Sequence, residues 1–279
     1  MKNFLTDILK NTTLTIYKYF NNNIMTGDLK HYNSKFYRRK WRKENAEIIL
    51  SSLLKVFPHV KSAIDFGCGI GVWLSAMKNL GVEQIQGYDG HWVDKNQLVI
   101  PKECFTEVDL DSAVDLNKKY DLAISIEVAE HLPENSAEMF VETLTKASDI
   151  VLFSAAIPYQ RGQNHVNEQW QDYWYNIFQK FDYEPTNIIR SIVWDNDKIA
   201  AIYKQNMVLY VKKEKIKELN ISDEYFDKTT LYLNVVHPEM WSGKLEKEGV
   251  YKISMLRLYR ITLKRTAQKI LGFWGVKIF

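Results

Sequence analysis

Cysteine and long apolar runs are both scarce in this sequence. The 279 residues include two cysteines, Cys68 and Cys104, which is too few for a disulfide framework, so we expect a reducing, cytoplasmic setting. Charged side chains (Asp7, Lys10, Lys18) interrupt residues 1 to 23, so we expect neither an export signal nor a membrane span there. No repeat or low-complexity tract occurs, and 46% hydrophobic residues suffice for a full buried core.

A strong excess of charge is also missing. The formal net charge is +3, which argues against a dedicated nucleic-acid binder. Seven lysines and arginines nevertheless gather in residues 30 to 43, interleaved with aromatic residues. This segment can grip an anionic acceptor such as nucleic acid or a phosphorylated sugar. The alternative, which we favour, is a cap helix with its aromatic side chains on a cleft and its charges in solvent.

The C-terminal segment is more skewed in charge. Residues 251 to 279 hold seven basic residues and no acid, with apolar side chains interspersed in a helical pattern. Such a helix can lie on an anionic membrane surface, at the inner face of the membrane. It can equally pack on a partner or on a second copy of the chain in a homodimer. Both interpretations stay open at the level of the sequence.

The richest local pattern is a glycine turn between a strand and a helix. A short buried strand begins at Ser62, glycines follow at every second position (Gly67, Gly69, Gly71), and a helix begins at Val72. Glycine lacks a Cβ atom, so the backbone can closely approach a ligand at the helix N-terminus. A second strand ends on Asp89, where an acid accepts hydrogen bonds from ribose hydroxyls.

The glycine spacing separates two kinds of nucleotide ligand. Dinucleotide-binding turns have the spacing GxGxxG, whereas the run here is DFGCGIG, with an acid two residues before the first glycine. That acid, Asp65, would repel a pyrophosphate and suits the amino end of a methionyl group. The run resembles the first motif of class I S-adenosylmethionine-dependent methyltransferases. The resemblance implies that S-adenosylmethionine is held at its methionine end by Asp65, Gly67, Cys68, Gly69 and Gly71, with further contacts from Glu127, Asp89 and Gly90 (ribose), and Asp109 and Leu110 (adenine).

The rest of the core alternates strands and helices. Strands are predicted over 104–108, 120–126, 149–154 and 207–211, and a helix over 133–146. We therefore expect an α/β fold with a doubly wound, Rossmann-like sheet of seven mostly parallel strands. The predicted domains are an N-terminal helical cap (1–50), a catalytic domain (51–212) and a C-terminal extension with a basic amphipathic helix (213–279).

Two polar clusters follow the fourth and fifth predicted strands. The first contains Glu127, Glu130 and His131, and the second, within residues 163 to 170, contains His165 and Glu168. Ligands of doubly wound sheets bind at the carboxyl ends of the strands, and adjacent strand ends face one cleft. We therefore expect His165 to approach the acids and the imidazole of the first cluster.

These groups can activate a hydroxyl for methyl transfer in two ways. His131 or His165 can act as a general base, with Glu168 orienting the imidazole. Alternatively, a divalent metal such as Mg, Mn or Fe can lower the hydroxyl pKa. The ExxEH run resembles the metal site of small-RNA 2′-O-methyltransferases and the ubiquinone-pathway O-methyltransferases, which implies Glu127, Glu130, His131 and His165 as ligands. A similar run also occurs in class I methyltransferases that need no metal.

The acceptor is less clearly specified. Aromatic and amide side chains between 181 and 206, including Gln205 and Asn206, are typical of sugar binding, although each can be a core residue. Together with HVNEQW (165–170), they resemble bacterial and phage methyltransferases of surface-polysaccharide (capsule) gene sets, over residues 31 to 212. We expect O-methylation of a carbohydrate or a similar polyhydroxylated small acceptor. The alternatives are a metal-dependent RNA 2′-O-methyltransferase and a non-catalytic protein that keeps the cofactor pocket as a scaffold.

Overall fold

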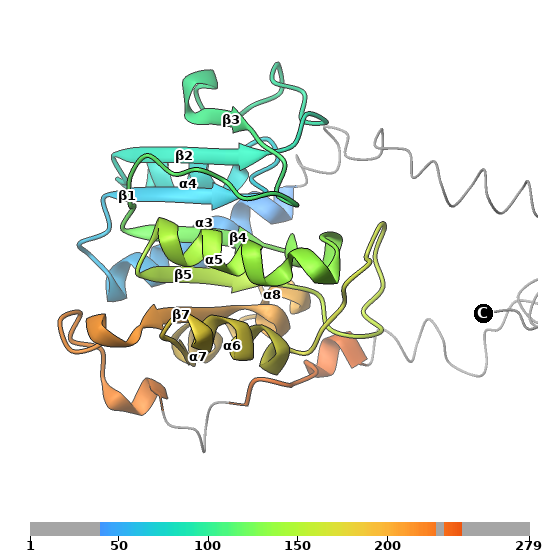
Figure 1. The fold of residues 1–279 in the computed structure, drawn as a ribbon. Coiled ribbons are helices and arrows are strands. Elements are labelled where there is room, and N and C mark those ends of the chain that lie inside the picture. The colour runs from blue at the N-terminus through green and yellow to red at the C-terminus, as the bar shows by residue number, and fades with distance from the viewer. Residues whose placement is uncertain (1–39, 227–231, 242–279) are drawn as a thin grey trace, which may run out of the picture. The chain divides into compact units, whose positions relative to one another are not determined.

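The computed structural model describes residues 40–226 and 232–241, and its centre is a seven-stranded sheet of order β3-β2-β1-β4-β5-β7-β6 (Figure 1). The strands are β1 Ser62–Phe66, β2 Gln84–Asp89, β3 Phe105–Glu107, β4 Leu122–Ile126, β5 Ile150–Ser154, β6 Tyr183–Thr186 and β7 Val208–Lys212. The α-helices are α3 Lys40–Val56, α4 Val72–Asn79, α5 Ala137–Ala147, α6 Gln171–Lys180, α7 Ile188–Val193 and α8 Ala201–Asn206. Residues 235–279 form a separate compact unit, of which 235–241 are described.

The strand directions decide which segments meet at one edge of the sheet. β1 pairs in parallel with β2 and β4, and β4 pairs in parallel with β5. β7 runs antiparallel to β5, with Phe153 opposite Val208. The start of β7, and α8 before it, therefore lie at the same edge as the carboxyl ends of the parallel strands. The predicted seven-stranded, mostly parallel, Rossmann-like sheet is confirmed.

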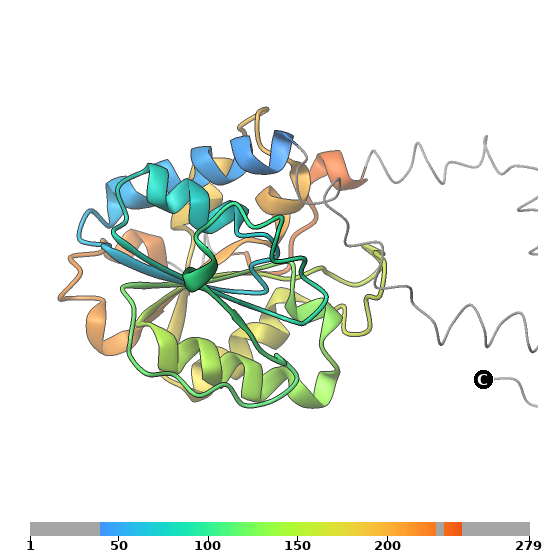
Figure 2. The ribbon, with the colours of Figure 1, turned by 90° about the horizontal axis from the view of Figure 1, so that it is seen from above.

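Helices cover both faces of the sheet, as the view along it in Figure 2 shows. Helices α3, α4 and α7 pack together on one face, and α5 and α6 pack together on the other. Each strand contributes side chains to the hydrophobic layer on both faces of the sheet, because successive side chains point to opposite faces. In β5, Ile150 and Leu152 join the first layer, whereas Val151 and Phe153 join the second. Burial on both faces explains why β4 and β5 are continuously apolar in sequence.

The N-terminal helix of the described region is part of the main packed body. We predicted a helix from residue 45, and α3 begins at Lys40 and crosses the predicted domain boundary at residue 50. Its inner side chains, Ala46, Ile49, Leu50 and Leu53, have no solvent exposure. The predicted cap residues 1–39 and the basic helix in 251–279 lie outside the described residues. Within the described ranges, no helix has the length and apolar character to cross a membrane.

One acid fastens the start of β1 to the start of β4. The Oδ2 atom of Asp121 accepts hydrogen bonds from the Lys61 amide (2.8 Å), the Ser62 amide (2.8 Å) and the Ser62 hydroxyl (2.9 Å). Both strands carry site residues at their far ends. The Asp121 carboxylate thus helps to fix the register of the two central strands.

Asp121→Ala is expected to lower the free energy of unfolding by about 2 kcal/mol, because hydrogen bonds to a charged group stabilise by roughly 1.5–3 kcal/mol. Urea unfolding followed by circular dichroism measures this change. Asp115→Ala, the same substitution at an exposed acid of the preceding loop, is the control. Equal stability of the two variants would contradict the proposed fastening role.

Candidate active site

The glycine turn is tied to the neighbouring strand. The amides of Gly67 and Cys68 both donate to the carbonyl of Tyr88, at 2.7 and 3.2 Å. Gly67 has φ +80° and its Cα faces the side chain of Val128, so a Cβ atom there would clash with that side chain. Gly71, with φ +87°, begins α4. The turn therefore needs glycine both for its backbone conformation and for its close contact with the segment after β4.

Two buried acids lie beside this turn. Asp89 accepts hydrogen bonds from the amides of Gly69 (2.6 Å) and Gly90 (2.7 Å). Asp65 is 2% exposed, and its Oδ2 atom has no hydrogen-bond partner. Burial raises the pKa of Asp65 well above its usual range, and the charge of Asp89 adds to that rise. Burial also raises the pKa of Asp89, against the effect of its two amide donors.

This pair of acids fits the ligand that the glycine motif implies. Neighbouring buried carboxylates without a compensating cation are unfavourable. S-adenosylmethionine carries an ammonium group and a sulfonium group, which supply positive charge and N–H donors. The unpartnered oxygen of Asp65 is thus suited to the methionine end of this cofactor.

The remaining predicted cofactor residues differ in how much they are exposed. Asp109 is exposed and accepts hydrogen bonds from the Asp111 amide (3.0 Å) and the Ser112 hydroxyl (3.4 Å), which shape the turn after β3. Leu110 is 5% exposed and packs in the core. The Val108 amide donates to the Asp89 carbonyl at 2.9 Å, so this turn starts beside Asp89. Cys68 is buried, and burial raises the pKa of its thiol, so this thiol is not a nucleophile.

His165 is held by a carboxylate. Its Nδ1 atom lies 2.8 Å from Oε1 of Glu168, and the same oxygen accepts a hydrogen bond from the Arg161 amide at 2.7 Å. In a neutral His165, a carboxylate acceptor at Nδ1 places the ring proton on Nδ1 and leaves the lone pair on Nε2. Because α6 begins only at Gln171, Glu168 belongs to the loop after β5. The structure thus brings Glu168 and His165 together as expected for an oriented base.

Glu130, His131 and His165 form a compact group, which we call the Glu130 cluster. One ligand atom from each residue lies within 4.8 Å of the others. Nε2 of His165 is 4.0 Å from Oε1 of Glu130, and the two imidazole rings meet edge to face. The amides of Val166 and Asn167 donate to the Glu130 carbonyl, which fixes the loop after β5 on the segment after β4.

The electrostatics of the Glu130 cluster favour a bound positive charge. Glu130 has no solvent exposure, and neither carboxylate oxygen accepts a hydrogen bond. Burial, followed by the charge of Glu127, raises the pKa of Glu130 well above its usual range. Burial is the main cause that lowers the pKa of His131 to about 4, and His165 adds to this shift only when it is protonated, so the His131 imidazole is neutral at physiological pH. A buried acid beside two imidazoles could hold a divalent cation.

Glu127 lies outside this cluster. Its backbone has φ +56°, and its amide donates to the hydroxyl and the carbonyl of Ser154. Its carboxylate accepts hydrogen bonds from Nδ2 of Asn206 (3.0 and 3.2 Å) and Nε2 of Gln160 (3.3 Å). Burial raises the pKa of Glu127, and the bond from Asn206 is the largest opposing effect. Of the four predicted metal ligands, three converge and Glu127 turns toward side-chain amides.

From the sequence, Asn206 was recognisable only as an amide of the kind that binds sugars, and Gln160 was not singled out. Asn206 precedes β7, whose antiparallel direction brings its start, and not its end, to the site. The sequence does indicate a short strand directly after Asn206. It does not indicate that Asn206 contacts Glu127.

Gly162 leaves the space that the His165 imidazole occupies. A Cβ atom at residue 162 would collide with Nε2 of His165. We expect Gly162→Ala to turn this imidazole away and lower turnover by about tenfold to 100-fold, because small displacements at a reacting centre have effects of this size. Methyl-transfer assays measure the loss, and calorimetry should show unchanged S-adenosylmethionine affinity. Gln163→Ala, at the exposed neighbouring position, is the control, and equal turnover of both variants would refute this placement.

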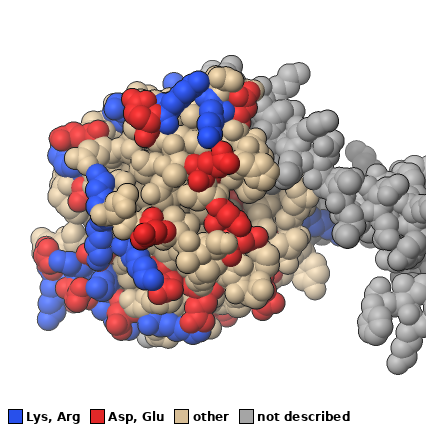
Figure 3. Space-filling view, turned by 45° about the horizontal axis from the view of Figure 1, so that its top comes forward, with Lys and Arg blue, Asp and Glu red and all other residues tan. Residues whose placement is uncertain are grey.

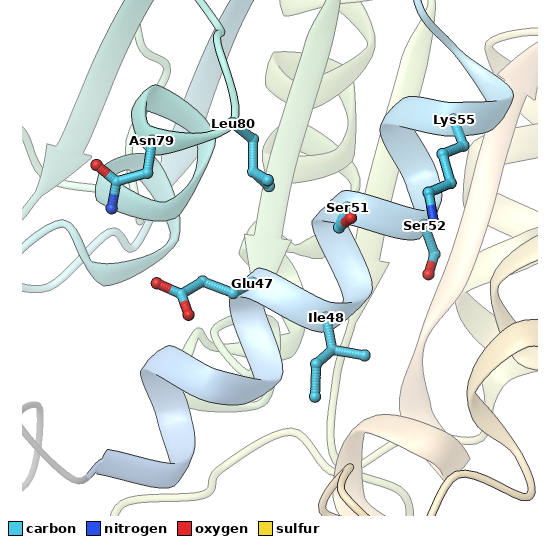
Figure 4. Close-up of a pocket in the computed structure, with 7 residues that line it drawn as sticks. All are labelled: Glu47, Ile48, Ser51, Ser52, Lys55, Asn79 and Leu80. Atoms are coloured by element: carbon cyan, nitrogen blue, oxygen red, sulfur yellow. The ribbon is translucent and has the colours of Figure 1, made fainter.

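The molecular surface has a groove away from the candidate site, and its charges are of both signs. A groove of about 540 Å³ lies between α3 and the end of α4, toward the amino ends of β1 and β2 (Figure 4). It contains none of the predicted site residues, which lie at the opposite edge of the sheet. Basic and acidic side chains are intermixed over most of the face in Figure 3. Among the described residues, this face shows no broad basic surface; four of the seven basic residues in segment 30–43 lie outside the described ranges.

Comparison with known proteins agrees with the fold and with the glycine motif. Residues 37–188, more than half of the chain, match the family described as "Methyltransferase domain". The structure is similar to the plantazolicin methyltransferase BpumL in complex with a monoazolic desmethylPZN analog and SAH, with TM-score 0.50, 14% identity, and coverage of 69% of this chain and 93% of that chain. A comparison with curated protein sequences gives no match.

Two further solved structures match at lower similarity. The methyltransferase domain of bacterial CtHen1 has TM-score 0.45 and 21% identity, with 60% of this chain and 98% of that chain covered. Human N-acetylserotonin methyltransferase in complex with SAM has TM-score 0.46 and 15% identity, with 69% of this chain and 58% of that chain covered. The chain belongs to the methyltransferase-domain family and is an enzyme that uses S-adenosylmethionine as its methyl donor.

Proposed function

We propose that this enzyme transfers a methyl group to a hydroxyl of a carbohydrate or a similar polyhydroxylated small acceptor, in cell-surface polysaccharide synthesis. We propose oxygen as the methylated atom because the site contains the His165 imidazole. Oε1 of Glu168 lies 2.8 Å from Nδ1 of His165, so a neutral imidazole in this position has its Nε2 lone pair beside the Glu130 cluster. A hydroxyl needs such a base, because it is a weak nucleophile until its proton is removed.

In the proposed reaction, Nε2 of His165 accepts the proton of the acceptor hydroxyl while the acceptor oxygen forms its bond to the methyl carbon. When bound, S-adenosylmethionine supplies that methyl group, and the electron pair of the broken carbon–sulfur bond stays on sulfur. The carboxylates of Glu168 and Glu130 stabilise the imidazolium that forms. The acids Asp65 and Asp89 hold the cofactor at its methionine and ribose parts, with Asp109 and Leu110 at the adenine.

A divalent cation fits the Glu130 cluster. One carboxylate and two imidazoles form a hard to borderline donor set, suited to magnesium, manganese or iron. Glu130, His131 and His165 would hold it, and it would lower the pKa of a bound acceptor hydroxyl. The cation and the imidazole base are alternatives for the same step, because His165 cannot offer one lone pair to both.

The flanking segments carry proposals of their own. We propose that the basic C-terminal helix contacts an anionic membrane surface or a second copy of the chain, with the enzyme in the cytoplasm or at the inner face of the membrane. We also retain the division into a cap (1–50), a catalytic domain (51–212) and an extension (213–279). Most residues of the cap and of the basic helix lie outside the described ranges.

Radiolabelled S-adenosylmethionine tests the acceptor class. The full chain is incubated with a panel of methyl glycosides and, separately, with short single-stranded RNA, each with Mn²⁺ or with EDTA. We expect label in a glycoside, and loss of labelling in EDTA would support the cation. Labelling of RNA alone, with an affinity that falls steeply with salt, would instead support an RNA 2′-O-methyltransferase. Methylation on nitrogen would contradict the proposed hydroxyl acceptor.

A further inference from the structure

Three side-chain amides form a closed hydrogen-bond network under Glu127. One N–H of Asn206 bonds to the Glu127 carboxylate, and the other bonds to Oε1 of Gln160 at 3.0 Å. Gln205 donates to Oε1 of Gln160 (3.2 Å) and to Oδ1 of Asn206 (3.0 Å). Gln160 in turn donates to Glu127 at 3.3 Å. We call Gln160, Gln205 and Asn206 the amide clamp.

The number of N–H donors in use shows that the side chains of the amide clamp fix one another's orientation. Each side-chain amide has two N–H donors, and the clamp uses both from Asn206 and both from Gln205. Asn206 is 0% exposed and Gln205 is 1% exposed, whereas Glu127 and Gln160 are half-buried. The buried members therefore fix the orientation of the two members that reach the more open side of the site.

We propose that Asn206 and Gln160 are positioning residues that hold Glu127 on the acceptor side, apart from the Glu130 cluster. A cation bound at the Glu130 cluster would then have three protein ligands and not four. This inference rests on the proposed function of the site. Its chemical consequence is a position left open for an acceptor oxygen. The spare lone pairs of Glu127 and the second N–H of Gln160 form an acceptor and donor pair, which complements another hydroxyl. The acceptor then carries a hydroxyl beside the one that is methylated.

Calorimetric titration of the full chain with Mn²⁺ tests the ligand set. Glu130→Gln is expected to weaken Mn²⁺ binding by at least about tenfold, in the range found for altered metal sites. Glu127→Gln makes the same chemical change three residues earlier and is expected to change the affinity by less than about twofold. Asn206→Leu releases Glu127 from its main amide donor and is expected to strengthen Mn²⁺ binding, because the freed carboxylate can then join the three ligands. A loss in Glu127→Gln as large as that in Glu130→Gln would overturn the inference.

Nuclear magnetic resonance tests the amide clamp without any metal. The side-chain amide signals of Asn206 and Gln160, assigned from their own variants, are expected to shift in Glu127→Gln and to stay in place in Glu130→Gln. Unchanged signals in Glu127→Gln would refute the clamp. If the unmodified chain binds no Mn²⁺, the cation proposal fails and these spectra alone decide whether Glu127 is held by the amides.

Discussion

Asp89→Ala is expected to weaken S-adenosylmethionine binding by about 100-fold or more. Asp89 has one structural role that the hydrogen bonds show and one role that we propose. It orders the glycine turn through the amides of Gly69 and Gly90, and it is the acid proposed to bind the ribose hydroxyls. Each hydrogen bond to a charged group contributes roughly 1.5–3 kcal/mol, and a loss of about 1.4 kcal/mol is tenfold in affinity. Isothermal titration calorimetry measures the change.

Matched variants separate this effect from general damage. Glu107→Ala removes an exposed acid at the end of the neighbouring β3 and should leave cofactor binding intact. Asp89→Asn keeps one acceptor oxygen and should give an intermediate loss. Asp109→Ala should cost less than Asp89→Ala, because Asp109 is exposed and its oxygens already serve the local turn. Near-normal binding by folded Asp89→Ala would remove Asp89 from the cofactor site.

His165→Ala is expected to lower turnover by about 100-fold to 10,000-fold, the usual contribution of a positioned acid or base. Cofactor affinity should change by less than about twofold, because His165 lies in the loop after β5 and the glycine turn follows β1. Single-turnover assays with labelled cofactor, on the acceptor that the panel identifies, measure the first quantity. Calorimetry measures the second.

Glu168→Gln provides the graded comparison. It keeps a hydrogen-bonding group next to Nδ1 of His165 but removes the charge, so we expect a smaller loss of turnover than in His165→Ala. His59→Ala is the control. It changes an exposed histidine before β1, at the opposite edge of the sheet, and should leave turnover unchanged. Turnover of His165→Ala equal to that of His59→Ala would exclude His165 from the mechanism.

The glycine turn and its contact with Asp89, which we propose hold the cofactor, could be predicted from sequence because their determinants are local. The positive φ at Gly67 and Gly71 depends on residue type within one turn, and Asp89 ends the next strand of the same βαβ unit. The hydrogen bond from the Gly69 amide to Asp89 joins the turn after β1 to the end of the parallel neighbour β2. Strand spacing and glycine chemistry therefore specify this part without knowledge of the rest of the fold.

The acceptor half depended on contacts between distant segments. Glu127 and Asn206 are far apart in sequence and meet only because β7 runs antiparallel and starts where β4 ends. No pattern in the ExxEH run distinguishes Glu127 from Glu130. The structure separates them, since Glu130 is fully buried next to His165 while Glu127 turns to the amide clamp.

The sequence by itself determined the α/β class, six of the seven strands (all but β6), the methyl donor and the edge of the sheet where the candidate site residues lie. Each follows from periodicity, from glycine conformation or from residues within one strand–helix unit. Only the tertiary structure decided the partner of each carboxylate. Two acids three residues apart acquire different neighbours because hydrogen bonding and burial depend on which other strands and loops fold against them.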